Sequence, residues 1–220
     1  MVRFRMIPEG RMQLIRKHLW SSIVGMSLGM MALPACSSTA SSPTGGSSAT
    51  TPTRDDAMRV LSAVLLDMTA TLYNENLVGH SSGAVNTSSA CPVSGSVDIT
   101  GTLSINKLAA GSASTSSDLT LHMSNCGATT PNGELTGDTG TSNALTYKGS
   151  WVNDSTGAVT QETLTLAGTA ALSGSVIVQS QSVAVDEPTC QLSITYVEDN
   201  GSWTVSGVVC GVSVHYAGTK

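Results

Sequence analysis

The sequence predicts a mainly β protein: a curved antiparallel meander, or incomplete barrel, packed on one N-terminal amphipathic helix. Beyond residue 79, apolar residues alternate with Ser and Thr, which is typical of strands with one buried face. Turn-forming residues separate these runs at short intervals, and no apolar segment of helical length lies between them. Neighbouring strands are therefore expected to be antiparallel, with about eight to ten strands in all. A two-sheet β-sandwich is the alternative architecture.

The helix is predicted over residues 54–78. Thr53 and Asp56 have the spacing of a capping box. In this motif, the side chain of each residue accepts a hydrogen bond from the backbone N–H of the other residue at the helix N-terminus. The apolar residues that follow recur at helical spacing, at Ala57, Val60, Leu61, Val64, Leu65, Met68 and Leu72. The polar side of the helix is expected to carry Asp56, Arg59, Ser62 and Asp67.

The antiparallel β-domain is predicted over residues 84–220. Glycines interrupt the strand patterns at positions 101, 137, 149, 168, 174 and 207, and they indicate bends or bulges that curve the sheet. The chain contains only one Phe, three Trp and four Tyr, which is little bulk to fill a closed barrel. We therefore expect the apolar face of the helix to fill the concave side.

The first 35 residues have the parts of an export signal, with basic residues followed by an apolar stretch over residues 19–35. That stretch is short for a membrane-spanning helix, and Gly25, Gly29 and Pro34 weaken its helicity, so cleavage is expected. A start at Met12 in place of Met1 would leave a more compact signal peptide.

The apolar stretch ends in Leu33, Pro34, Ala35 and Cys36. This string resembles the lipobox of bacterial lipoproteins, which ends in the cysteine that is acylated and becomes the mature N-terminus. The resemblance implies lipidation of Cys36 and attachment to a membrane through that lipid. Ser37 after the cysteine is similar to outer-membrane lipoproteins, so we expect an anchor in the bacterial outer membrane, facing the periplasm or the cell surface.

Residues 36–53 contain no large apolar side chain and are rich in Ser, Thr, Pro and Gly. Such a segment cannot bury enough surface to offset its ordering entropy and is predicted to be a flexible tether. At ordinary coil scaling it would hold the domain roughly 20–25 Å from the bilayer.

The chain has five cysteines, and removing Cys36 leaves an even set, as expected of an exported domain. Three pairings of this set are possible. We favour the sequential one, because a hairpin at Asp199, Asn200 and Gly201 would bring two of the cysteines opposite each other, with a bulge expected near the turn. The predicted disulfides are Cys91 with Cys126 and Cys190 with Cys210.

Beyond residue 35 the chain carries five basic against fourteen acidic side chains, a net charge of −9. This balance disfavours nucleic acid and anionic lipid head groups as partners. Membrane attachment should therefore come from covalent lipid.

Three groups of residues are candidate chemical sites. Residues 79–83 match the G-x-S-x-G pattern of serine hydrolases, with Ser81 as nucleophile, but that motif requires a preceding strand and a following helix. His122 with Cys126 and Cys210 with His215 have spacings found in metal sites, but disulfides compete for the cysteines and both histidines fall on the polar face. The acidic pairs at residues 186–187 and 198–199 lie in predicted turns, where solvation is the ordinary role.

We therefore expect a lipid-anchored envelope protein with a non-catalytic structural or binding β-domain and no cofactor or metal. Its partners would be an envelope protein, a glycan or an acyl chain. The alternatives are a carrier of a hydrophobic ligand between helix and sheet, and a serine hydrolase that uses Ser81.

Overall fold

The computed structural model describes residues 51–77, 79–108, 111–156 and 158–219, and in these residues it contains one helix and nine strands. The predicted leader, the lipidation site at Cys36 and most of the tether lie outside the described residues. In chain order the elements are α2 (Arg54–Leu77), β1 (Gly83–Ala90), β2 (Ser94–Lys107), β3 (Ala113–Thr130), β4 (Gly133–Asp138), β5 (Leu145–Asn153), β6 (Val159–Val178), β7 (Gln181–Asp199), β8 (Ser202–Val209) and β9 (Val212–Thr219).

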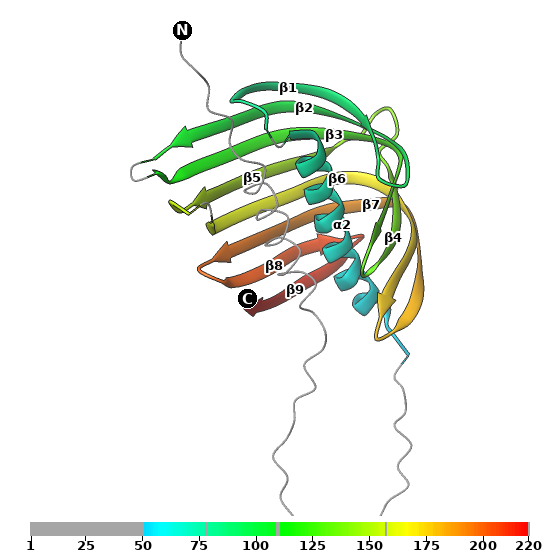
Figure 1. Cartoon of the computed structure of the whole chain (residues 1–220). Helices are drawn as coiled ribbons and strands as arrows, with labels where there is room; N and C mark the ends of the chain where they lie inside the picture. The colour runs from blue at the N-terminus through cyan, green and yellow to red at the C-terminus, as the bar shows by residue number, and fades with distance from the viewer. Residues whose placement is uncertain (1–50, 78, 109–110, 157, 220) are drawn as a thin grey trace, which may run out of the picture.

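All nine strands belong to one antiparallel sheet, which curves around α2 (Figure 1). The strand order is β1-β2-β3-β4-β6-β7-β8-β9. Strands β4 and β5 share one place in the sheet, because β3 and β6 each pair with β4 along one half and with β5 along the other. The curved antiparallel prediction is confirmed, and the alternative sandwich is wrong because a single sheet contains every described strand. Within these residues β1 and β9 are the two edges, so the barrel is not closed.

The turn between β6 and β7 lies at Gln179 and Ser180, where both residues have positive φ, 50° and 66°. Two consecutive residues of positive φ give the twist that a tight hairpin requires. The sequence analysis instead predicted a turn at Asp186 and Glu187, and that prediction is wrong. These residues lie inside β7, where the register shifts between Ala170 and Leu172 of β6, and this bulge accommodates Pro188 in a central strand.

The predicted turn between β7 and β8 is confirmed, with Asn200 at φ 48° and Gly201 at φ 84°. The pairing of the two strands continues from Asp199 and Ser202 without a register shift, so the expected bulge near this turn is not found. The hairpin is centred between Asn200 and Gly201, and not on Asn200, which accounts for the side-chain alternation without an extra residue.

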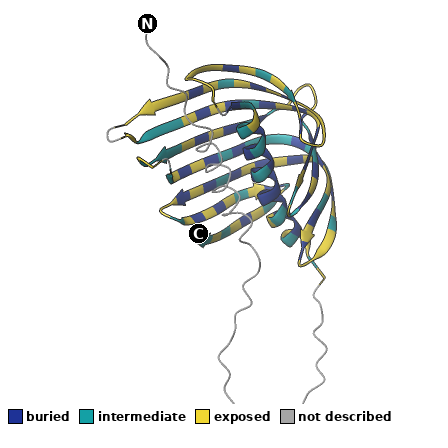
Figure 2. Cartoon of the chain, in the orientation of Figure 1, coloured by how far each residue is buried: buried dark blue, intermediate teal, exposed yellow. Residues whose placement is uncertain are grey.

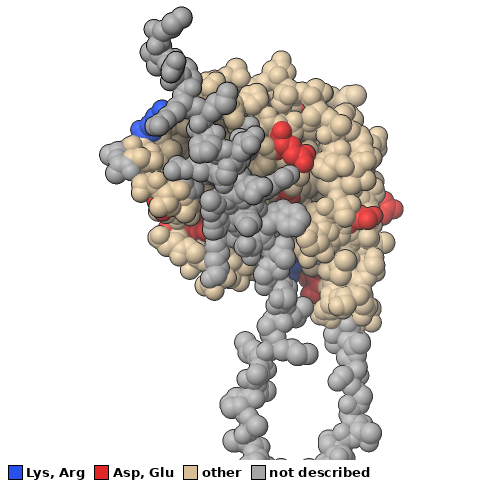
Figure 3. All heavy atoms as spheres, in the orientation of Figure 1, with Lys and Arg blue, Asp and Glu red and all other residues tan. Residues whose placement is uncertain are grey.

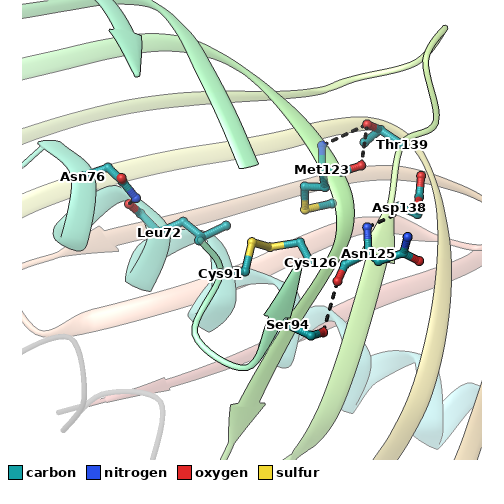
Figure 4. The surroundings of a disulfide bond; sticks show 9 residues. All are labelled: Leu72, Asn76, Cys91, Ser94, Met123, Asn125, Cys126, Asp138 and Thr139. Carbon is teal, nitrogen blue, oxygen red and sulfur yellow. Dashed lines mark hydrogen bonds between the residues drawn. A yellow bond between two sulfur atoms is a disulfide. The ribbon is translucent and has the colours of Figure 1, made fainter. Parts of the chain in front are cut away.

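Both predicted disulfides are present, Cys91–Cys126 and Cys190–Cys210, with Cα atoms 5.4 and 4.4 Å apart. The first ties the end of β1 to β3 beside Leu72 and Asn76 of α2 (Figure 4). The sequence separations are 35 and 20 residues. Loop-closure entropy then predicts a stabilisation of about 3 to 4 kcal/mol from each disulfide.

The N-terminus of α2 is capped as predicted. The backbone N–H of Asp56 donates to Thr53 Oγ1 at 3.2 Å, and the backbone N–H of Thr53 donates to Asp56 Oδ2 at 3.1 Å. Arg54 extends from the same turn and donates to Glu187 Oε1 at 2.9 Å and to the carbonyl oxygen of Cys210 at 3.1 Å. The beginning of the helix is thus held to the β7 bulge and to the second disulfide.

The core lies between α2 and the concave face of the sheet. Buried and exposed residues alternate along the strands, as Figure 2 shows. Leu61, Val64 and Leu72 of the helix are fully buried. Ser62 is fully buried as well, and its hydroxyl lies 2.8 Å from the hydroxyl of Tyr216 in β9, so its predicted place on the polar side of the helix is wrong. Ser62 therefore faces β9 and not solvent.

Four of the six glycines predicted to bend the sheet do so in the same manner. Gly101, Gly168, Gly174 and Gly207 have φ between 138° and 145°, a conformation that side chains rarely adopt. At each position an added Cβ would collide with a backbone carbonyl of the neighbouring strand, at Asp118, Ala144, Glu134 and Ser193 respectively. The other two, Gly137 and Gly149, lack positive φ and instead make room for the side chains of Met123 and Trp151.

Substituting one of these glycines should destabilise the protein by more than the backbone strain of a positive φ would cause alone. We expect Gly207→Ala to lower the free energy of unfolding by about 3 kcal/mol or more, because the methyl group meets the carbonyl of Ser193. Gly83→Ala is the matched control, since Gly83 has φ 147° with nothing within 4 Å of an added Cβ, and it should cost only about 1 to 2 kcal/mol. Urea unfolding measures both values, and equal losses would contradict the role of the carbonyl.

Candidate functional site

The G-x-S-x-G motif of residues 79–83 lies between the helix and strand β1. Gly79 has φ 95° and follows the helix, the backbone N–H of His80 donates to the carbonyl of Leu77 at 3.0 Å, and β1 begins at Gly83. The order is helix, turn and strand, the reverse of a nucleophile elbow, and both His80 and Ser81 are exposed. This geometry supplies neither the strained turn nor the helix N-terminus that would activate Ser81.

The histidine and cysteine pairs also follow the prediction. All four cysteines of the β-domain are disulfide-bonded, and His122 and His215 are exposed on the outer face. His122 Nδ1 lies 3.0 Å from the carbonyl oxygen of Asn143. Among the described residues, no group of three or more His, Cys, Asp or Glu side chains is arranged to hold a metal ion.

The two acidic pairs have different environments. Glu187 forms the ion pair with Arg54, at 2.9 Å, so its role is to position the helix. Glu198 was expected to be solvated in a turn, and that expectation is wrong. It is the next-to-last residue of β7 and only 3% exposed, on the same face of the strand as Ile194 and Tyr196.

Glu198 belongs to a row of large and charged side chains that crosses four neighbouring strands on the concave face. The β-sheet register pairs Trp151 of β5 with Glu162 of β6, Glu162 with Glu198 of β7, and Glu198 with Trp203 of β8. We call these four residues the acid–aromatic row. Three strand spacings separate its ends, about 14 Å. The row lies near the rim of the sheet, where the β5–β6 and β7–β8 connections are.

Each tryptophan of the row lies over a glycine. An added Cβ at Gly149 would lie 2.8 Å from Cζ3 of Trp151, so the indole of Trp151 folds back along its own strand. An added Cβ at Gly218 of β9, the register partner of Trp203, would collide with the six-membered ring of Trp203. The absence of a side chain at these two glycines lets the indoles lie against the sheet.

Tyrosines surround the row. Tyr73 of α2 stacks on Tyr147, with ring centroids 5.7 Å apart, and meets Trp151 edge-on at 5.2 Å. At the other end Trp203 meets Tyr216 edge-on at 6.1 Å. Tyr196 lies on the inner face of β7 and donates its hydroxyl proton to Glu198 Oε2 at 2.6 Å. The helix end and the strands together hold both indoles in fixed orientations.

The negative charges of Glu162 and Glu198 help to raise the pKa values of two neighbouring tyrosines. Burial raises the pKa of Tyr147 well above its ordinary value, and the charge of Glu162 raises it further. Burial also raises the pKa of Tyr196, as do its hydrogen bond to Glu198 and the charges of Glu198 and Glu162. Glu162 is 9% exposed, so both carboxylates act through a medium of low polarity.

Within the part of the chain that the structure describes, two polar atoms close to the row have no hydrogen-bond partner. These are Nε1 of Trp203, in a side chain 8% exposed, and Oγ of Ser117, 6% exposed, beside Gly149 and Trp151. A buried donor or hydroxyl without a partner costs about 1 to 3 kcal/mol, so most such groups in proteins are satisfied by protein, water or a ligand. The row thus combines two carboxylates and two indole faces with an N–H donor and a hydroxyl that bond to no other described residue.

The row was missed in the sequence analysis, although the signal for it was present. Glu162 has the same alternation as Leu164 and Leu166, and Glu198 has the same alternation as Ile194 and Tyr196. Strand parity therefore places both acids on the buried face. Assigning Glu198 to the turn hid this pattern, and only the register of β6 and β7 shows that the two acids face each other.

No family model, curated protein or solved structure matches this chain. The described part of the chain contains no helix that is both long enough and apolar enough to span a bilayer.

The hydrogen bond to Glu198 should matter more to stability than a similar bond between neutral groups. Tyr196→Phe should lower the free energy of unfolding by about 2 kcal/mol, because it removes the donor to a buried carboxylate. Tyr216→Phe removes a neutral bond to Ser62 and should cost about 1 kcal/mol. Urea unfolding at pH 7 compares the two, and an equal or larger loss for Tyr216→Phe would contradict the greater contribution of the bond to Glu198.

Stability should fall at alkaline pH. The pKa values of Tyr73, Tyr147, Tyr196 and Tyr216 are raised in the folded protein, chiefly by burial. Above pH about 10 the unfolded chain loses phenol protons that the folded protein retains, so the free energy of unfolding decreases as pH rises. Urea unfolding between pH 8 and pH 11 should show this decrease, with a shallower slope in Tyr196→Phe. An unchanged free energy over this range would contradict it.

Proposed function

We propose that this protein is a lipid-anchored bacterial envelope protein, attached through Cys36 to the outer membrane, with a non-catalytic β-domain that binds a ligand. The observation that carries the anchor is the pairing of Cys91 with Cys126 and Cys190 with Cys210. These disulfides use every cysteine except Cys36, which ends the lipobox-like string of residues 33–36. Two disulfides also favour an oxidising compartment such as the periplasm or the cell surface.

The acid–aromatic row supports binding as the role of the β-domain. Its indoles are held against the sheet by Gly149 and Gly218, and its polar groups converge from four strands. Rigid aromatic faces with a few fixed polar groups are the ordinary composition of a ligand site. The charge of the row favours a polar ligand over the acyl chain of the alternative carrier function.

Packing under the helix also weighs against acyl-chain carriage. Leu61, Leu65 and Met68 of α2 are at most 1% exposed and fill the concavity against the sheet. The part of the described chain that is visible in Figure 3 is mostly uncharged, with a few acidic groups, which suits a domain held near the membrane by lipid and not by basic residues.

The anchor is tested on the full-length gene expressed in a Gram-negative host with its export signal intact. We expect the protein in the outer-membrane fraction, with the intact mass of residues 36–220 plus diacylglyceryl and acyl groups, less four hydrogens for two disulfides. Cys36→Ala should abolish the lipid mass and the membrane association.

Ser37→Asp is the matched variant for the choice of membrane. It should keep the lipid mass and move the protein to the inner membrane. An unmodified Cys36 on a soluble wild-type protein would overturn the anchor, and a lipidated protein in the inner membrane would overturn the assignment to the outer membrane.

A further inference from the structure

We propose that β9 is the contact surface between two copies of this chain, which pair antiparallel along their β9 strands and form one continuous sheet. Strands β1 and β9 are the two edges of the sheet in the described part of the chain (Figure 1). An edge strand presents a row of backbone N–H and C=O groups that another strand can pair with.

The chain protects one edge of its sheet and leaves β9 bare. Strand β7 pairs with β8 only from Leu192 onward, so its first half pairs with β6 alone among the described strands. This half carries Asp186, Glu187, Pro188 and a bulge, which are devices that natural sheets use against edge-to-edge pairing. Strand β9 contains no charged residue and no proline, and its pairing with β8 runs without a register shift. It therefore has none of the devices that protect β7.

The backbone groups of β9 that point away from β8 belong to its exposed residues. The β8–β9 turn consists of Cys210 and Gly211, with φ 47° and 82°, so Val209 and Val212 bracket a two-residue hairpin and form a hydrogen-bonded pair. Hydrogen-bonded and non-bonded pairs alternate along an antiparallel ladder. The residues that direct their N–H and C=O groups away from β8 are therefore Ser213, His215, Ala217 and Thr219, all of them exposed.

Strand β9 is complementary to itself in one register. With Tyr216 on the two-fold axis, Ser213 lies opposite Thr219 of the second copy, and His215 lies opposite Ala217. Each outward-directed residue then meets another such residue, which gives about eight hydrogen bonds between the copies. The next register with the same faces aligned leaves one of these four residues without a partner in each copy. A two-fold pair of this kind is closed and contains two copies.

Charge and packing also favour a second copy as the occupant of this edge. Residues 36–220 carry a net charge of −9, so two copies repel each other, but residues 202–219 of β8, β9 and their turn contain no Asp, Glu, Lys or Arg. Tyr216 is held by its contact with the Ser62 hydroxyl at 2.8 Å and by the edge of Trp203 at 6.1 Å. The two Tyr216 rings would form an aromatic pair across the axis, whereas β1 contains no aromatic residue.

The test measures the mass of the processed protein, purified in detergent from cells that express the full-length gene. Sedimentation equilibrium in a solvent that matches the density of the detergent reports the mass of the protein alone. We expect two copies at high concentration and one copy after dilution, with the same Kd in Cys36→Ala, which separates pairing through β9 from association of lipid. One copy at every concentration, or an open series of larger masses, would overturn the proposal.

Matched proline variants assign the contact to β9. Ala217→Pro removes an N–H that points away from β8 and leaves the bonds to β8 in place, so it should raise the Kd of the dimer at least tenfold. Ala84→Pro is the control, because Ala84 is also an exposed alanine of an edge strand, β1, and it should change the Kd less than twofold. Equal weakening by both variants, or weakening by Ala84→Pro alone, would overturn the assignment to β9.

Amide hydrogen exchange of the wild-type protein keeps the proposal testable if a proline variant fails to fold. The amide hydrogens of the four outward-directed residues of β9 should exchange at least tenfold more slowly in the dimer than after dilution. Exchange at Ala84, Asn86 and Ser88 of β1 should not change. Slowing on β1 in place of β9, or no slowing on either strand, would overturn the proposal, while the lipid anchor is decided separately by the intact mass.

Discussion

The fold depends on the close approach of backbone carbonyls to glycines that have no Cβ. At Gly101, Gly168, Gly174 and Gly207, each on the inner face, a side chain would collide with the carbonyl of the neighbouring strand. These residues adopt positive φ, which kinks the strands toward the helix. Curvature brings the inner faces of strands far apart in sequence around α2, so one helix can cover a sheet of nine strands (Figure 1). A flat sheet would leave much of this apolar face in water.

Contacts with the sheet hold the helix near both of its ends. Arg54 connects the first turn to Glu187 and to the carbonyl of Cys210, whose disulfide joins β7 to the segment after β8. Near the C-terminal end, the Cys91–Cys126 disulfide lies beside Leu72 (Figure 4). Aromatic contacts from Tyr73 extend this end toward Tyr147 and Trp151. The same packing that fixes the helix therefore also fixes one side of the acid–aromatic row.

The buried polar groups of the acid–aromatic row lower the stability of the sheet relative to apolar residues at the same positions. Two carboxylates on a buried face carry a desolvation cost, whereas Leu or Val at these positions would only add to the core. Trp203 Nε1 and Ser117 Oγ, in the same area, form no hydrogen bond to any described residue. Natural proteins break local packing rules of this kind mainly at functional sites. This concentration of polar groups next to a well-packed core supports the proposed binding role of the row.

The sequence by itself determined the fold class, the capped helix and most of the bending glycines, because each depends on local periodicity or on short-range turn chemistry. It favoured the two observed disulfides among three possible pairings, with a local argument only for Cys190 and Cys210, and the structure decided the pairing. Strand parity in the sequence also placed Glu162 and Glu198 on the inner face, although the turn assigned at residues 198–199 concealed it. Only the tertiary structure decided that β4 and β5 share one place in the sheet, that the β6–β7 turn lies at Gln179 and Ser180, and that the two glutamates face each other. These features depend on pairing register between distant segments, which a one-residue shift would alter and which no local pattern specifies.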